Sequence, residues 1–378
     1  MKEDRIDIVV PDEVLAENDA KIHRLEAAHR LERPDRVPVL AGGNQFMNLT
    51  ARNRTFAQYI RSPEDNLREQ ILSWKWQIEN IRDDAPIPTK SLTFRPDLGC
   101  LRGTEFPMEI VWQEDGPPKC VHPLQSLEDV DRLSVPPPDG GLNARYIEWH
   151  GLMTRAAERL DVRLNGKPLR IEVTLSQGGG PIPAAFALAG VNLFLWVLED
   201  PARTRRLMDV VTQSHLNCIR HYDALVGRDT AHPIWMGCDT GEMLSPAMFR
   251  EFVVPYYLRV WEQYPGPPRA FHMCGQINHL LTILRDELRI TKLDGFGSVT
   301  DRGKLADEMS GRLVLQGGPE PLLIFRGNRD EIVRECVSYI RTVGRSGGYI
   351  LCPGGGAVPG TPTDHFAWMV EASERAAE

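Results

Sequence analysis

The feature that most constrains the fold of this chain is a regular alternation of predicted strands and helices from about residue 145 onward. Short apolar runs at residues 171–175, 233–238, 269–274, 292–296, 312–316 and 348–352 are separated by helical patterns. Such runs indicate parallel strands joined by helical crossovers. About eight such units in one chain predict an α/β fold of the (β/α)8 TIM barrel type, with an open doubly wound sheet as the alternative.

The first part of the chain fits the same interpretation. Residues 17–32 read as a charged helix that ends before Pro34, and residues 37–40 as a first strand. Residues 62–82 are helical in pattern, whereas residues 85–142 are rich in proline and predict short strands mixed with loops. We therefore expect an N-terminal helical segment over residues 1–35 and a single barrel domain over residues 36–378, with irregular insertions.

The charge and composition of the chain argue against several classes of partner. Its 44 Lys and Arg residues and 52 Asp and Glu residues give a net charge of −8, which disfavours binding to nucleic-acid phosphates. No apolar run approaches the ~20 residues that span a bilayer, and the N-terminus has no apolar signal core. Seven scattered cysteines do not make a disulfide framework. We expect a cytoplasmic protein that binds neither nucleic acid nor membrane.

Polar side chains that can perform chemistry follow the predicted strands at the points where the strands end. In a parallel barrel these points share one face, where barrel enzymes build their sites. The glycines that accompany them permit tight turns, although glycine is also common in turns that have only a structural role. The strand-end residues are Gln177, Cys238, Asp239, Glu242, His272, Cys274, Asp294, Gln316 and Cys352.

The sharpest group among them is His272, Cys274 and Cys352. Side chains alternate along a strand, so His272 and Cys274 share one face. One imidazole and two thiolates form a zinc ligand set that leaves a fourth position open, as in catalytic zinc sites. The alternative is that the cysteines are small buried hydrophobes and the histidine a core residue. Cys238 could join or replace a ligand, or simply pack in the core.

At these residues the chain resembles the uroporphyrinogen decarboxylase superfamily, which includes zinc-dependent, corrinoid-linked methyltransferases. The resemblance extends from about residue 20 to residue 370, and it depends on the order and spacing of short motifs. The family fold is a (β/α)8 barrel, as the alternation of elements also predicts. The motifs include Arg33-Pro-Asp-Arg-Val-Pro-Val39, Gln113-Glu-Asp-Gly-Pro-Pro118, Gly237-Cys-Asp-Thr-Gly241, Phe271-His-Met-Cys-Gly275 and Leu315-Gln-Gly317.

The resemblance implies one of two chemistries. The decarboxylase is cofactor-free and binds the carboxylates of its substrate with arginines after the first strand, whereas residues 41–50 of this chain carry no cation before Arg52. The zinc methyltransferases look like this chain at His272 and Cys274, two of their metal ligands. Their third ligand is a cysteine in the last glycine-rich loop, often about three residues beyond Cys352, where this chain has Gly355.

The resemblance therefore implies a zinc-dependent methyltransferase or demethylase that moves a methyl group between a small substrate and a corrinoid (cobalamin). The chain has no Asp-x-His-x-x-Gly motif, so we expect the corrinoid on a partner protein or as free cobalamin; the resemblance also allows a homodimer. The alternatives are a cofactor-free decarboxylase or other lyase, and a non-catalytic relative that binds a tetrapyrrole or corrinoid. We expect Zn²⁺ on His272, Cys274 and Cys352, catalysis by Asp239 and Glu242, and substrate contacts from Asn44, Gln177 and Gln316.

Overall fold

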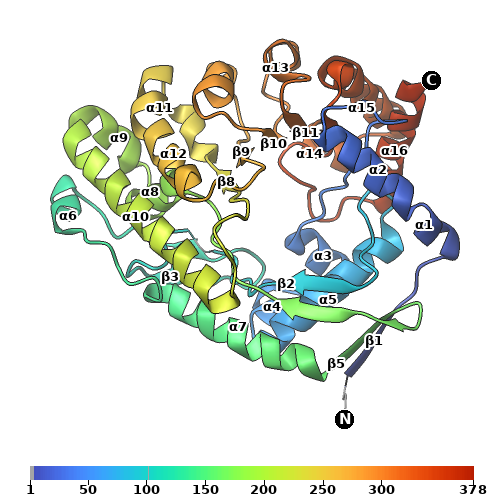
Figure 1. The fold of residues 1–378 in the computed structure, drawn as a ribbon, viewed down its shortest axis with the longest axis horizontal. Helices are drawn as coiled ribbons and strands as arrows, with labels where there is room; N and C mark the ends of the chain where they lie inside the picture. The colour runs from blue at the N-terminus through green and yellow to red at the C-terminus, as the bar shows by residue number, and fades with distance from the viewer. Residues whose placement is uncertain (1–3, 101) are drawn as a thin grey trace.

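The computed structural model describes residues 4–100 and 102–378, which form a (β/α)8 barrel with helices arranged around the strands (Figure 1). The first strand position is marked by a parallel bridge between Val39 and Leu351. The remaining barrel strands are β2 (Ser91–Phe94), β7 (Arg170–Val173), β8 (Met236–Gly237), β9 (Ala270–His272), β10 (Lys292–Phe296), β11 (Val314–Gly317) and β12 (Tyr349–Leu351).

The register of the parallel strands brings polar residues from neighbouring strands side by side. Five strands form one sheet in the order β12-β11-β10-β9-β8, and β2 pairs with β7. Asp294 of β10 lies opposite His272 of β9 and opposite Gln316 of β11. Because residues in register on parallel strands point to the same face, these three side chains lie next to one another on one face of the sheet.

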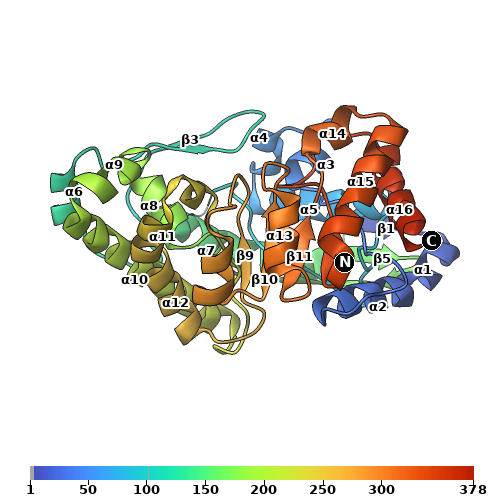
Figure 2. The same cartoon turned by 90° about the horizontal axis from the view of Figure 1, so that it is seen from above.

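Helices cover the outside of the barrel (Figures 1 and 2), and several of them begin at a residue whose side chain caps the first turn. Ser62, Asp200 and Asn328 each accept a hydrogen bond from a backbone N–H in the first turn of the following helix. The helices of this layer are α3 (Gln45–Ala51), α4 (Phe56–Tyr59), α5 (Pro63–Asn80), α6 (Leu127–Arg132), α7 (Gly141–Arg159), α8 (Pro181–Ala189), α9 (Asn192–Glu199), α10 (Pro201–Val226), α11 (Pro246–Phe252), α12 (Val254–Gln263), α13 (Arg302–Met309), α14 (Pro321–Arg326), α15 (Arg329–Val343) and α16 (Thr363–Ala377). Within residues 4–100 and 102–378, only α8 and α9 taken together, with a bend of 100° between them, have the length and apolarity of a bilayer span, and no helix has them alone.

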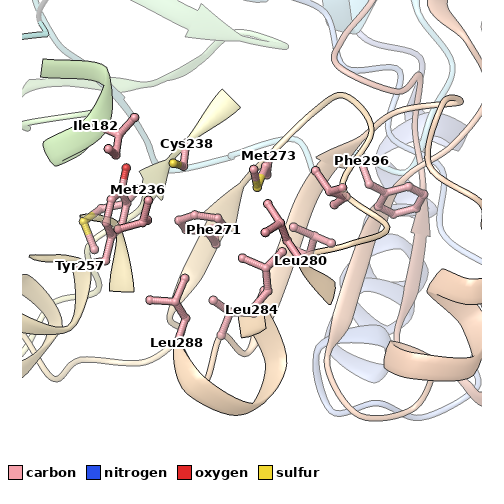
Figure 3. Close-up of a cluster of buried hydrophobic side chains, with 14 of the residues drawn as sticks. Ile182, Met236, Cys238, Tyr257, Phe271, Met273, Leu280, Leu284, Leu288 and Phe296 are labelled. Atoms are coloured by element: carbon pink, nitrogen blue, oxygen red, sulfur yellow. The ribbon is translucent and has the colours of Figure 1, made fainter. Parts of the chain in front are cut away.

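The core beneath these helices explains how β9 presents its polar side chains. Phe271 and Met273 are fully buried and lie in the apolar cluster drawn in Figure 3, which also contains Tyr257 of α12. His272 and the neighbouring Cys274 are only partly buried. Side chains alternate along a strand, so packing Phe271 and Met273 among the helices turns His272 and Cys274 to the other face.

The N-terminal segment differs from the prediction that residues 1–35 are helical. Strand β1 (Asp4–Ile8) pairs in parallel with β5 (Leu160–Leu164) before helices α1 (Asp12–Ala16) and α2 (Asn18–His29) begin. Strand β5 turns into β6 (Lys167–Pro168), and a second small antiparallel pair is formed by β3 (Ile110–Val111) and β4 (Lys119–Cys120). The prediction of a purely helical segment is therefore wrong for β1, because its pairing partner lies more than 150 residues away along the chain.

One buried histidine makes the stability of the fold depend on pH. His215 on α10 is 2% exposed, and burial lowers its pKa from 6.5 to about 4. The unfolded chain therefore binds one more proton than the folded protein between these values, so stability falls as the pH drops from about 6.5 toward 4. At about 1.36 kcal/mol for each pKa unit, the loss reaches roughly 3 kcal/mol.

We expect His215→Leu to reduce the loss of stability that the protein shows as the pH falls below about 6.5. The measurement is urea unfolding at pH 7 and at pH 5, in which the difference between the two pH values should shrink in the variant. His221→Gln, at a partly exposed position of the same helix, serves as the control and should keep the parent's pH dependence. An equal pH dependence in His215→Leu and the parent would contradict the assignment.

Candidate metal centre

Three side chains at the carboxyl ends of β8 and β9 form a compact group of metal-binding type. One ligand atom each from Asp239, His272 and Cys274 lies within 4.8 Å of the others, and we call these three residues the ligand cluster. Oδ1 of Asp239 is 3.3 Å from Nε2 of His272 and 3.3 Å from Sγ of Cys274. The cluster thus presents one oxygen, one nitrogen and one sulfur atom to a common point.

The local chain geometry explains why these residues converge. Gly237 at the end of β8 lies opposite His272 in the parallel register, and Asp239 then begins the 3-10 helix η1 (Asp239–Met243). The backbone N–H of Cys274 donates to Oδ1 of Asp239 at 3.2 Å, which ties the chain beyond β9 to the chain beyond β8. The cluster is therefore built from two neighbouring strand ends, as the barrel fold allows.

A carboxylate binds the imidazole of the cluster at Nδ1, the nitrogen that faces away from the cluster, and an indole in turn binds that carboxylate. Nδ1 of His272 is hydrogen-bonded to Oδ1 of Asp294, and Nε1–H of Trp235 donates to Oδ2 of Asp294 at 2.8 Å. The Trp235 and His272 rings lie 5.7 Å apart between centroids. A carboxylate on Nδ1 fixes the orientation and tautomer of a metal-binding histidine so that Nε2 faces the metal.

The same contacts govern the charge of His272. Burial lowers its pKa, but the contacts with Asp294, Cys274 and Asp239 outweigh burial and raise the pKa to about 10. The imidazole therefore takes up a proton readily when only carboxylates and a thiol surround it. A site with more negative than positive groups around it also attracts a cation.

The structure does not bring Cys352, the third predicted ligand, into the ligand cluster. In the described part of the chain, the ligand cluster includes neither Cys352 nor Cys238. Cys352 follows β12, which is three strands from β9, and at ~4.8 Å between strands the path along the sheet is about 14 Å. Both thiols are buried, and burial raises the pKa of each to about 12.

The two residues predicted to be catalytic both make contacts at or beside the ligand cluster. Asp239 belongs to the ligand cluster itself, where it takes the place predicted for Cys352. Glu242 accepts a hydrogen bond from the backbone N–H of Gln276 at 2.6 Å, and a Cβ at Gly275 would lie 2.0 Å from its Oε2. Glu242 therefore holds the turn that follows Cys274, rather than pointing freely into a cavity.

The three residues predicted to contact substrate lie in different places. Asn44 accepts from the N–H of Met47 and donates to the carbonyl of Ala357, so its amide caps α3 and we assign it a structural role. Gln316 contacts the thiol of Cys352. Gln177 is buried with Oε1 unpartnered and lines a 350 Å³ cavity, and its role as a substrate contact stays a prediction.

A larger cavity of 890 Å³ adjoins the ligand cluster, and we call it the large cavity. Asp239 and Trp235 line it, together with the apolar side chain of Phe186. Its volume lies in the range of small-molecule sites. The large cavity therefore supplies the approach by which a small substrate can reach the cluster.

Sequence reasoning placed Asp294 at a strand end but assigned it no role, and it missed Trp235. The signal for Asp294 was available, because it lies in register with His272 on the adjacent strand. Trp235 had no such signal, since its role depends on a side-chain contact between β8 and β10 that neighbouring positions in the sequence do not reveal.

The glycine after Asp294 makes room for the His272 imidazole. Gly295 has a φ of +76°, and a Cβ there would lie 2.0 Å from Cε1 of His272. We expect Gly295→Ala to push the imidazole out of the cluster and to lower the affinity for added Zn²⁺ or Co²⁺ at least ~10-fold, the size of effect seen when supporting contacts are lost. Metal retention after dialysis against a chelator measures the change.

Gly297→Ala provides the matched control for this variant. A Cβ at Gly297 meets no atom closer than 3.7 Å, so metal retention should equal that of the parent. Equal retention in both variants would show that the imidazole of His272 is not confined as the structure indicates. Circular dichroism of the two variants separates loss of the cluster from loss of the fold.

Comparison with known proteins gives the same fold and a family. The chain is 28% identical over 366 residues to the uroporphyrinogen decarboxylase of Anaeromyxobacter sp. (strain Fw109-5) and 27% identical over 365 residues to that of Anaeromyxobacter dehalogenans (strain 2CP-C), covering 93% of this chain and 97% of each relative. A methyltransferase from Methanosarcina mazei superposes with a TM-score of 0.64 at 18% identity, over 93% of this chain and 97% of that chain. The uroporphyrinogen decarboxylase (URO-D) family model matches residues 20–376, which confirms the resemblance seen in the sequence: the chain belongs to the uroporphyrinogen decarboxylase family.

Proposed function

We propose that this member of the family is a zinc-dependent methyltransferase or demethylase, which moves a methyl group between a small substrate and a corrinoid carried by a partner protein. The observation that carries the proposal is the ligand cluster of Asp239, His272 and Cys274, whose Asp239 lines a cavity of 890 Å³. The cofactor-free decarboxylase chemistry of the family has no use for a thiol, an imidazole and a carboxylate directed at one point.

The donor set of the ligand cluster fits zinc. Zinc accepts nitrogen, sulfur and oxygen ligands, and three protein ligands leave a fourth position for substrate. The carboxylate of Asp294 on Nδ1 of His272 supplies the supporting contact that such histidines usually have. Zinc bound there would supply Lewis acidity to the heteroatom of the substrate that gains or loses the methyl group.

The residues of this chain prepare the site for that chemistry. Asp294 orients the imidazole of His272, and the indole N–H of Trp235 holds the second oxygen of Asp294. Glu242 fixes the turn after Cys274 through the backbone N–H of Gln276. These contacts hold the donor atoms before substrate arrives, which reduces reorganisation during the reaction.

Three exposed apolar side chains that follow barrel strands support the part of the proposal that concerns a corrinoid-carrying partner. Met243, Val299 and Leu322 follow β8, β10 and β11, and their side chains are 65%, 60% and 43% exposed. Exposed apolar side chains grouped around a site are a mark of protein–protein contact. A partner bound there would cover the mouth of the barrel and exclude water from the transfer.

Uroporphyrinogen decarboxylation is the second candidate function. The curated relatives carry this name, and the cations Arg95, Arg102 and Lys119 line the large cavity, where they could bind carboxylates. Against it, Arg52 is held by Glu69, at 2.7 Å, rather than facing a cavity. Arg54 is held by the same carboxylate at 3.0 Å, so neither cation after the first strand is free for a substrate carboxylate.

Two measurements on the purified protein decide between the candidates. The proposal expects about one zinc per chain and a change in the absorption spectrum of reduced cobalamin when a methylated donor is added. The decarboxylase alternative expects loss of carboxyl groups from uroporphyrinogen at an undiminished rate in the presence of a chelator. Protein that contains no zinc, fails to bind added zinc and decarboxylates uroporphyrinogen would refute the methyltransferase proposal.

A further inference from the structure

Two cysteines outside the ligand cluster meet in the wall of the large cavity. Cys100 lies in the loop after β2, and Cys120 ends β4. Both are partly exposed, both line the 890 Å³ cavity, and each thiol lies near enough to the other to be the largest influence on its pKa. The proposed methyl transfer uses neither of them.

The backbone around the two cysteines is arranged for close approach. Gly99 has a φ of +75°, and a Cβ at this position would lie 2.7 Å from Cδ of Pro118. Cys120 is held in the antiparallel pair opposite Ile110. The glycine therefore allows the chain just before Cys100 to lie against the chain just before Cys120.

The pair has the chemistry required for thiol–disulfide exchange. The contact with Cys100 lowers the pKa of Cys120 to about 7, and the same contact raises the pKa of Cys100. A thiolate is thus available at neutral pH next to a second thiol that can resolve a mixed disulfide. Arg102 and Lys119 also line this cavity and favour negative charge in it.

The other cysteines of the chain are placed differently. Cys274 belongs to the ligand cluster, where a bound metal would occupy its sulfur. The remaining thiols are buried, which removes them from reaction with dissolved disulfides. These buried residues are Cys218, Cys238, Cys336 and Cys352.

We propose that Cys100 and Cys120 form a reversible disulfide on contact with a small-molecule disulfide such as oxidised glutathione. The Cys120 thiolate attacks one sulfur of oxidised glutathione, forming a mixed disulfide and releasing one glutathione thiolate. Cys100 loses its proton and attacks the Cys120 sulfur, which releases the second glutathione thiolate. The two protein thiols together lose two electrons and two protons, and oxidised glutathione becomes two reduced glutathiones.

The disulfide would join the loop after β2 to strand β4 across the wall of the large cavity. Asp239 and Trp235 line the same cavity. The oxidised protein would therefore hold this wall in a fixed position beside the approach to the ligand cluster. This inference does not depend on methyl transfer, because it concerns a separate pair of thiols.

The experiment uses the full chain with Cys274→Ser, which removes the cluster thiol from the count. In the reduced protein we expect about two rapidly reacting thiols per chain, and after oxidised glutathione about none. The intact mass should fall by about 2 Da without a glutathione adduct, and peptide mapping should join Cys100 to Cys120. Dithiothreitol should restore both thiols. If the Cys274→Ser protein does not fold, peptide mapping of the wild-type chain gives the same answer.

Single variants in that background test the order of attack. With Cys100→Ser, the mixed disulfide cannot be resolved, so a stable adduct of about 305 Da should remain on Cys120. Cys336→Ala changes a buried thiol away from the pair and should leave the oxidation unchanged. The proposal would be overturned if each of the two cysteines carried its own glutathione adduct. It would also be overturned if the protein that retains both cysteines lost no thiols on treatment with oxidised glutathione. Thiol counts and masses are independent of methyl transfer, so failure here is distinguishable from failure of the proposed function.

Discussion

Replacing Cys274 by serine should remove zinc from the protein and leave the fold intact. Cys274 supplies the sulfur of the ligand cluster, and a neutral serine hydroxyl is a poor substitute for a thiolate on zinc. Because loss of a supporting contact alone costs ~10–100-fold in metal affinity, loss of a ligand should cost at least about 100-fold, with methyl transfer falling at least as far. Elemental analysis after dialysis, together with circular dichroism, measures both parts of the prediction.

Cys352→Ser is the informative control for this variant. The sequence alone predicts Cys352 as a zinc ligand, whereas the structure places its buried thiol beside Gln316 and outside the ligand cluster. Cys352→Ser should therefore keep its zinc, at some cost in stability from a buried hydroxyl. The reverse result, with zinc lost in Cys352→Ser and kept in Cys274→Ser, would refute the ligand cluster.

Replacing Asp84 by alanine should produce the largest loss of stability. Its side chain is fully buried and receives two hydrogen bonds from Arg36, at 2.6 and 2.9 Å, and one from Arg24 at 3.1 Å. It also accepts the backbone N–H of Val39, whose bridge to Leu351 marks the first strand position. The alanine would leave the charges of Arg36 and Arg24 without this carboxylate. Loss of one partner from a buried ion pair lowers the free energy of unfolding by about 3–5 kcal/mol.

Asp35→Ala tests whether burial is the cause. Asp35 pairs with the same Arg24, at 2.8 Å, but its side chain is 62% exposed. An exposed ion pair contributes about 1 kcal/mol or less, so the free energy of unfolding in urea should hardly change. Similar losses in Asp35→Ala and Asp84→Ala would show that burial of the Asp84 carboxylate does not set the effect.

Several elements could be predicted from sequence because their signals are local. Strand β10 and helix α5 match the predicted ranges closely, since apolar periodicity and a capping residue mark them. The pairing of His272 and Cys274 on one face was also local, because it depends only on the alternation of side chains along β9.

Other elements carried a signal that was not used. The chain turns from β5 to β6 through Asn165 and Gly166, which have φ values of +45° and +78°. An Asn-Gly pair between two short strands is a strong indicator of a hairpin. Its use would have predicted both strands, although it would not have identified β1 as the parallel neighbour of β5.

The barrel, the family and two of the three residues in the ligand cluster could be predicted from sequence, because alternation of elements, motif order and strand periodicity are properties of neighbouring residues. The structure was needed to show that Asp239 belongs to the cluster, that Asp294 and Trp235 support His272, and that Cys352 lies outside the cluster. These facts depend on which strands are adjacent around the barrel and on how far each strand extends. Such distances arise from packing of the whole chain, and no short stretch of sequence contains them.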